Sequence, residues 1–200
     1  MLRQRVPYIT LWNAEQTCSP RVVLTGKGIG FRKEKASDRD AHGILWRRVT
    51  NKPGQGRPDF RSVHFTRQRR AMGGLLCQVC ARPAREEATS DGVLFLLNST
   101  EYASDPWPAP IETAQPPLCV SCACEAVNAC PHLRNHWVAL RGVPRLHGVS
   151  GVLYRPGRQE PRVHDVATVP FGDRLAPWVE ATQLMVRLDK YTLVDLPARS

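Results

Sequence analysis

Two short stretches, Cys77-Gln-Val-Cys80 and Cys119-Val-Ser-Cys122, decide how the middle of this chain folds. In each stretch a two-residue spacer lets both sulfur atoms reach one metal ion, at about 2.3 Å for zinc, and two such pairs complete a tetrahedron. The 38 residues between the pairs exceed the roughly 15–20 of the tightest zinc patterns. The pairs predict one structural zinc ion held by four thiolates.

Other interpretations of the cysteines stay open. Reduced cysteines are often buried as small apolar side chains, and a redox Cys-x-x-Cys would explain one pair but not the second. Cys124, Cys130 and His132 follow closely and are possible substitutes for a knuckle ligand. His132 and His136 have the i, i+4 spacing of a second metal site, but the segment lacks the glutamate of a His-Glu-x-x-His protease. We favour a packing and capping role for this segment.

Composition and charge bound the class of protein. With 200 residues and 42% hydrophobic content, the chain can form one domain or two small ones around a real core. No apolar run approaches the roughly 18 residues of a membrane helix, and no apolar region of a secretory signal follows the start. We therefore expect no membrane contact, a cytoplasmic location, and metal or thiol chemistry for the seven cysteines.

The positive charge is concentrated in the first third of the chain. Residues 1–70 carry a net charge of +11 and residues 71–200 a net charge of −1. Such asymmetry favours a polyanionic partner, most simply DNA or RNA. The excess of arginine over lysine, 23 to 5, is also what a GC-rich genome produces without any function. That bias alone should spread the charge along the whole chain.

Residue patterns predict a mixed α+β fold. Short helices are expected at 66–76, with Thr66 as a possible N-cap, and at 123–129, which should stop before Pro131. A stripe from Leu175 to Val186 predicts one C-terminal helix. Loops are expected at 51–58 and 102–117. Strands are expected at 5–12, 21–25, 29–32, 43–50, 93–97, 137–141, 151–155, 163–169 and 191–196.

The first cysteine pair follows a short helix, and the second sits where another helix begins. This layout resembles a treble clef, and residues 64–135 resemble the zinc frame of HNH endonucleases. That resemblance implies a catalytic histidine on the strand between the knuckles, whereas residues 81–118 contain none. A further histidine expected after the second pair is replaced by Ala123. Without a base to activate water, cleavage of a phosphodiester has no evident nucleophile.

The chain as a whole resembles a family of uncharacterised small proteins of high-GC filamentous bacteria. The resemblance rests on four stretches and implies no activity. They are Asp-Arg-Asp-x-His-Gly at 38–43, Arg-Gln-Arg-Arg-Ala-Met at 67–72, Leu-Cys-Gln-Val-Cys at 76–80 and Cys-Pro-His-Leu-Arg at 130–134.

Several weaker candidates have a functional and a structural interpretation. A helix would place Arg67 and Arg70 on one face beside His64, and with Arg69 they form a candidate phosphate-binding surface; a solvated basic face explains them equally well. A cluster of Asp38, Asp40 and His42 suits a divalent ion or acid–base chemistry, but we favour a polar turn. Candidate catalytic residues of an enzyme alternative are His64, His132 and His136.

These observations predict an α+β protein with a treble-clef-like zinc centre flanked by small β-rich segments and one C-terminal helix. Its parts are a basic β-rich portion at 1–62, a zinc-binding segment at 63–136 and an α+β portion at 137–200, which together could pack as one globule. The expected function is nucleic-acid binding through the basic N-terminal half, with zinc in a structural role. The alternatives are a rebuilt HNH-like nuclease or other hydrolase, and a protein-interaction adaptor.

Overall fold

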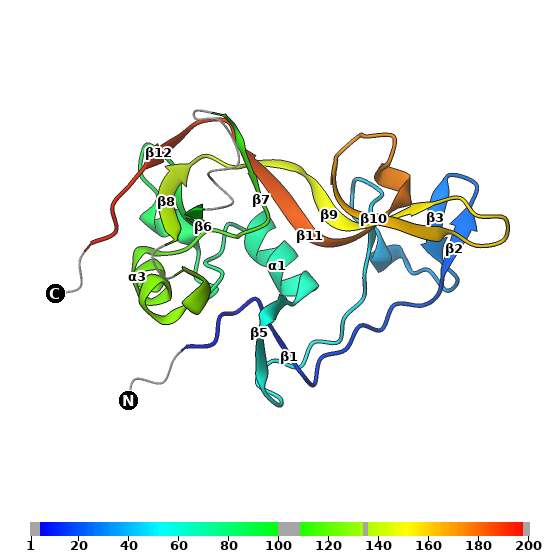
Figure 1. Ribbon diagram of the computed structural model, residues 1–200, viewed down its shortest axis with the longest axis horizontal. Coiled ribbons are helices and arrows are strands. Elements are labelled where there is room, and N and C mark those ends of the chain that lie inside the picture. The colour runs from blue at the N-terminus through cyan, green and yellow to red at the C-terminus, as the bar shows by residue number, and fades with distance from the viewer. Residues whose placement is uncertain (1–4, 100–108, 134–135, 198–200) are drawn as a thin grey trace. The chain divides into compact units, whose positions relative to one another are not determined.

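The computed structural model of the protein describes residues 5–99, 109–133 and 136–197 (Figure 1). The chain forms two compact units, each built from segments far apart in sequence. The cysteine unit consists of Met1–Ile9, Arg67–Leu146 and Val186–Ser200. The hairpin unit consists of Thr10–Thr66 and His147–Met185.

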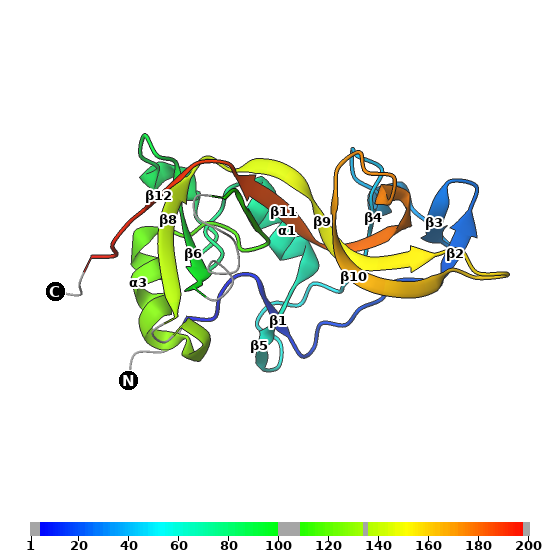
Figure 2. The same ribbon diagram turned by 45° about the horizontal axis from the view of Figure 1, so that its top comes forward.

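In the cysteine unit, an antiparallel sheet of order β12-β8-β6 packs against one helix, α3 (Figure 2). The central run Val93–Leu97 is buried throughout, which explains its unbroken apolar sequence. Leu94 and Leu96 of this run meet Ala123 of the helix and Ala139 of the neighbouring strand in one core that also holds three of the cysteines. The elements here are most of α1 (Phe65–Gly73), η2 (Ala84–Glu87), β6 (Val93–Asn98), β7 (Ile111–Thr113), α3 (Val120–Ala129), η3 (Pro131–Leu133), β8 (Trp137–Gly142) and β12 (Tyr191–Leu193).

The hairpin unit contains two antiparallel hairpins, β2–β3 and β9–β10. The turn of the first consists of Gly26 and Lys27, because Thr25 is paired with Gly28. The Gly28 backbone, at φ 147°, lies so close to Pro177 that a Cβ would clash with the proline carbonyl. The elements are β1 (Thr10–Trp12), β2 (Val22–Thr25), β3 (Gly28–Phe31), η1 (Ala36–Asp38), β4 (Leu45–Trp46), β5 (Pro58–Val63), most of β9 (Arg145–Arg155), β10 (Arg162–Pro170), η4 (Ala176–Trp178) and most of β11 (Val179–Leu188).

The α+β class is confirmed, but the predicted C-terminal helix is wrong. Residues Val179–Leu188 form strand β11, which lies between β9 and β4 in its sheet. Most of this strand is buried, so its apolar residues do not alternate with polar ones and imitate a helical stripe. The β-branched residues Val179, Thr182 and Val186 suit a strand, and sheet pairing overrides the apparent period.

Smaller differences concern element ends. Helix α1 begins at Phe65, so Thr66 lies inside it and is not its N-cap. The strand expected at 43–50 is reduced to Leu45–Trp46. The expected surface loop at 102–117 contains a short strand, Ile111–Thr113, while 102–108 lie outside the described residues. Across the described part of the chain, no helix is long and apolar enough to span a membrane.

Candidate metal centre

The first cysteine pair lies in a tight turn that follows helix α1. The backbone N–H of Cys77 donates to the carbonyl of Arg82 at 2.8 Å, and that of Ala81 donates back to the carbonyl of Cys77 at 2.8 Å. Closing this turn places Ala81 in the left-handed region at φ 61°, where non-glycine residues are uncommon. The geometry folds the two-residue spacer so that the Cys77 and Cys80 sulfurs face one point.

The second pair is presented by the start of helix α3. Cys119 is its N-cap residue and Cys122 lies in its first turn. The segment before it is fixed by two hydrogen bonds, from Leu118 N to the carbonyl of Leu94 and from Gln78 N to the carbonyl of Pro117, both 2.9 Å. The second of these ties the two pairs together directly.

The structure brings all four predicted ligands into one cluster. Their sulfur atoms lie within 4.8 Å of one another, and Cys119 Sγ lies 3.8 Å from both Cys77 Sγ and Cys80 Sγ. These separations far exceed the roughly 2.05 Å of a disulfide bond, and all four cysteines are free thiols. Cys77, Cys119 and Cys122 are buried, and Cys80 is partly exposed. Four convergent sulfurs of this kind are compatible with one metal ion.

The environment of each cysteine determines how readily its thiol loses a proton. Burial raises the pKa of Cys77, although backbone N–H groups, including those of Cys80 and Val79, point at its sulfur and favour the thiolate. Burial also raises the pKa of Cys122. At Cys80 burial acts in the same direction, but hydrogen bonds with the Arg82 side chain and backbone and with Cys77 and Cys119 together outweigh it and lower the pKa to about 7. The surroundings therefore favour ionisation at Cys80 and oppose it at Cys77 and Cys122.

Two arginines lie beside the sulfurs. Arg5 Nη1 is 3.6 Å from Cys122 Sγ, and Arg82 Nη2 is 4.0 Å from Cys119 Sγ. The N-terminal segment is held over the first pair because Tyr8 N donates to the Val79 carbonyl at 3.0 Å. Both arginines line an open concavity of about 590 Å³ together with Tyr8, Val79 and Cys80. The sequence offers a hint of Arg82, two residues after a ligand, but none of Arg5.

The substitute ligands do not join the cluster. Cys124 lies on α3 with its Sγ 3.7 Å from the Pro197 carbonyl, and Cys130 is the C-cap residue of that helix. Among the described residues, the four cysteines are the group that could hold a metal ion. His136 is exposed, and the side chain of His132 lies outside the described part of the structure.

Two of the four residues that were predicted to form a phosphate-binding surface, His64 and Arg67, are buried. His64 is fully buried, with Nε2 3.2 Å from the carbonyl of Thr50 and 3.7 Å from a Glu15 carboxylate oxygen. Arg67 is also buried, at 4% exposure. Neither side chain can meet the backbone of a nucleic acid, whereas Arg69 is half-buried and Arg70 is exposed.

The cluster of Asp38, Asp40 and His42 is a polar turn. Asp40 accepts hydrogen bonds from the backbone of His42 and Ile44 at 2.9 and 3.0 Å and from the indole of Trp46 at 2.9 Å. The His42 ring instead stacks on Phe171, with ring centroids 3.9 Å apart. These side chains are occupied by the turn and do not converge on an ion.

Comparison with family models, with curated proteins and with solved structures finds no match to this chain.

Proposed function

We propose that this chain is a nucleic-acid-binding protein in which Cys77, Cys80, Cys119 and Cys122 hold one structural zinc ion. The sulfur geometry carries the zinc proposal. Four sulfurs at about 2.3 Å from a central zinc define a tetrahedron whose edges are about 3.8 Å long. The two sulfur–sulfur distances from Cys119 are 3.8 Å.

The donor set and its charge support zinc in a structural role. Soft thiolates select zinc over the oxygen-seeking cations, and a site with four protein ligands leaves no position open for a substrate. Zinc with four thiolates carries a net charge of about −2. The guanidinium groups of Arg5 and Arg82 offset this charge from outside the ligand shell.

The path of the chain supports a treble-clef-like centre in part. A knuckle supplies the first two ligands, and the first turn of α3 supplies the last, where the helix N-terminus favours thiolates. Between the pairs, however, strand β6 is paired with β8, which follows the helix. Strand β7 is paired with β11. The cysteine unit therefore resembles a treble clef in the placement of its ligands and its helix more than in the pairing of its strands.

A nuclease of the HNH kind is the less favoured alternative. The segment between the two cysteine pairs contains no histidine, and the nearby His64 is buried. We expect that the purified protein with Mg²⁺ leaves supercoiled plasmid DNA uncut. Cutting that depends on His136 would instead favour the enzyme alternative.

Charge supports a DNA or RNA partner. The net charge of +11 in residues 1–70 remains the main indication, and the exposed part of this charge lies largely in the hairpin unit. A protein-interaction adaptor, in which zinc only holds the fold, is the alternative. Such an adaptor would ignore nucleic acids at low salt, whereas a phosphate-binding protein would show affinity that falls steeply with salt.

Elemental analysis tests the zinc proposal. The purified protein should contain about one zinc per chain, and Cys77→Ser should lose the metal together with cooperative melting of the cysteine unit. Cys124→Ser is the matched control, because that sulfur faces a carbonyl oxygen and not the cluster. A Cys77→Ser protein that keeps its metal and its melting transition would disprove the site.

A further inference from the structure

The hairpin unit carries a group of exposed cationic side chains at the ends of its two hairpins. Lys27 lies in the β2–β3 turn, and Arg32, Lys33 and Lys35 follow strand β3. Three more exposed arginines, Arg155, Arg158 and Arg162, surround the turn between β9 and β10. We call these seven residues the hairpin surface.

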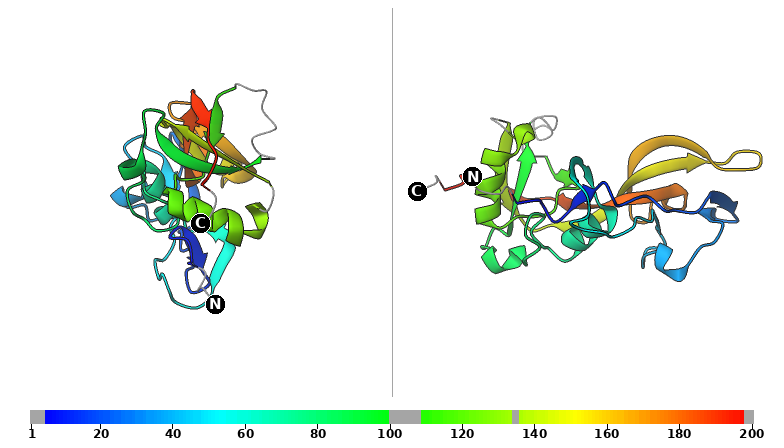
Figure 3. Two further views of the ribbon diagram at one scale, coloured as in Figure 1. Left: turned by 90° about the vertical axis from the view of Figure 1, so that its left-hand side faces the viewer. Right: turned by 90° about the horizontal axis from the view of Figure 1, so that it is seen from below.

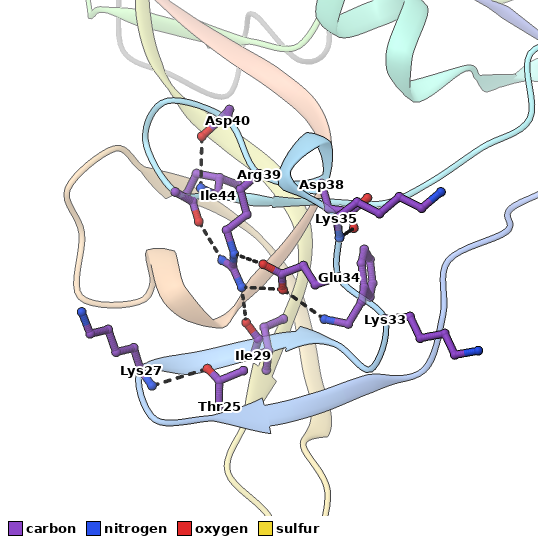
Figure 4. Close-up of polar contacts among 12 residues, drawn as sticks. Thr25, Lys27, Ile29, Lys33, Glu34, Lys35, Asp38, Arg39, Asp40 and Ile44 are labelled. Atoms are coloured by element: carbon purple, nitrogen blue, oxygen red, sulfur yellow. Dashed lines mark hydrogen bonds and ion pairs between the residues drawn. The ribbon is translucent and has the colours of Figure 1, made fainter.

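The acidic residues beside this surface are neutralised by other arginines. Arg39 holds both carboxylate oxygens of Glu34, at 2.6 and 3.0 Å, and donates further to the carbonyls of Ile29 and Gly43, each at 2.7 Å (Figure 4). In the same view Lys33 and Lys35 point away from this pair. The Arg39 guanidinium thereby holds the pKa of Glu34 below its ordinary value.

The second nearby acid is neutralised in the same way. Asp38 is buried and accepts from Arg48 Nε at 2.7 Å and from Arg48 Nη2 at 2.5 Å. Within the described residues, the side chains of the hairpin surface form no ion pair. These exposed charges therefore face solvent and are not neutralised by ion pairs within the protein.

Packing keeps the two hairpin ends together. Tyr154 near the end of β9 packs against the buried cluster of Ile29, Phe31 and Leu45. Arg21 forms an ion pair with Glu160 of the β9–β10 turn, and its carbonyl accepts from Arg32 N at 3.0 Å. Figures 1 and 2 and the right-hand view of Figure 3 show both hairpins toward the same end of the hairpin unit. These contacts join the two hairpins, and with them their exposed cations, in one packed part of the hairpin unit.

We propose that the hairpin surface binds the phosphate backbone of a nucleic-acid duplex. This inference rests on the nucleic-acid part of the proposed function and replaces α1 as the place of contact. Separate point charges on two hairpins suit a row of phosphates. Single-strand binding uses exposed aromatic rings for base stacking. Among the Phe, Tyr and Trp side chains that the structure describes, the exposed one is Phe60, which lies in strand β5 and not in either hairpin.

Salt-dependent binding to a short fluorescent DNA duplex of mixed sequence tests the surface. Each lost phosphate contact should reduce the slope of log affinity against log salt by about 0.9. We therefore expect the triple variant Arg32→Ala/Lys33→Ala/Arg158→Ala to lower the slope by about 2–3 and the affinity at low salt by more than about tenfold. Melting and zinc content should stay unchanged, because none of the three is a ligand or a core residue.

A matched control removes three exposed cations from the cysteine unit, in the variant Arg70→Ala/Arg85→Ala/Lys190→Ala. It should keep most of the slope. Equal losses in both triple variants would mean that only net charge matters and would overturn the hairpin surface, while nucleic-acid binding itself would stand. If the unaltered protein binds no duplex, both the surface and the nucleic-acid part of the proposed function fail. Preference for single strands, or for vesicles of anionic lipid, would also overturn the inference.

Discussion

Arg82 affects the cysteine cluster without being a ligand. Its guanidinium lies 4.0 Å from Cys119 Sγ, and its hydrogen bond to Cys80 favours the thiolate of that residue and lowers its pKa. We expect Arg82→Ala to reduce zinc affinity by about 10–100-fold, because outer-shell partners typically contribute this much. Competition with a chromophoric chelator at neutral pH measures the change. Arg85→Ala, an exposed arginine three residues away, should leave the affinity unaltered; a similar loss in both would argue for a general charge effect.

A second prediction at the residue scale concerns Asp38, whose ionisation should make the stability of the hairpin unit depend on pH. Hydrogen bonds from Arg48 lower the pKa of this buried carboxyl, so the folded protein binds fewer protons than the unfolded chain. The stabilisation is therefore present above the ordinary aspartate pKa of about 3.9 and is lost as the pH falls through the lower folded value. Asp38→Asn should cost about 1–3 kcal/mol of unfolding free energy at neutral pH.

The difference between Asp38→Asn and the unaltered protein should shrink below about pH 4. Urea unfolding followed at several pH values measures it. A difference that does not depend on pH would show that shape, and not charge, accounts for the effect.

At the scale of elements, the N-terminus of helix α3 is capped by a side chain from another element and not by its own N-cap residue. Its N-cap residue, Cys119, makes no side-chain capping bond, because its sulfur faces the cluster. Instead the Glu87 carboxylate accepts from Val120 N at 2.6 Å. Glu87→Ala should destabilise the cysteine unit by about 0.5–2 kcal/mol, the usual range for a lost cap. Thermal melting of the metal-bound protein gives the value, with the neighbouring exposed Glu86→Ala as control. Equal effects would remove the capping role.

Elements with strong local signals were predictable from the sequence. The glycines around Lys27 indicated the hairpin turn, and helix α3 ends at Ala129, before Pro131, as proline sterics require. Strand β11 was not predictable, because its apolar pattern reflects neighbours on both faces and not its own period. Local signals thus identify turns and helix ends, whereas central strands depend on the whole sheet.

The candidate sites were likewise predictable where local sequence determines them and not where tertiary packing does. Cysteine spacing was sufficient to predict the four clustered sulfurs, because the ligand chemistry is local to each pair. The nearness of Arg5 depends on pairing between residues 8–9 and the first knuckle, which no local pattern reveals. Burial of His64 and Arg67 likewise follows from tertiary packing. A helix that is rich in basic residues therefore need not present a basic surface to solvent.

At the scale of the whole molecule, the cysteine cluster belongs to one unit's core. It packs with Leu94, Leu96, Leu118 and Ala123 in the cysteine unit. A separate cluster of Ile29, Phe31 and Leu45 lies in the hairpin unit. Because binding of a structural metal is coupled to folding of the segments that supply its ligands, metal removal should act first on the cysteine unit.

We therefore predict that a strong chelator abolishes amide-exchange protection in β6 and α3 while β9, β10 and the first half of β11 keep theirs. Hydrogen exchange read by mass spectrometry on the full chain, with and without chelator, resolves these segments. Adding back zinc should restore the lost protection, and Cys77→Ser should reproduce the chelated pattern without chelator. Simultaneous loss of protection in both units would mean that they unfold as one cooperative body. Unchanged protection in β6 and α3 would mean that the metal does not hold this fold.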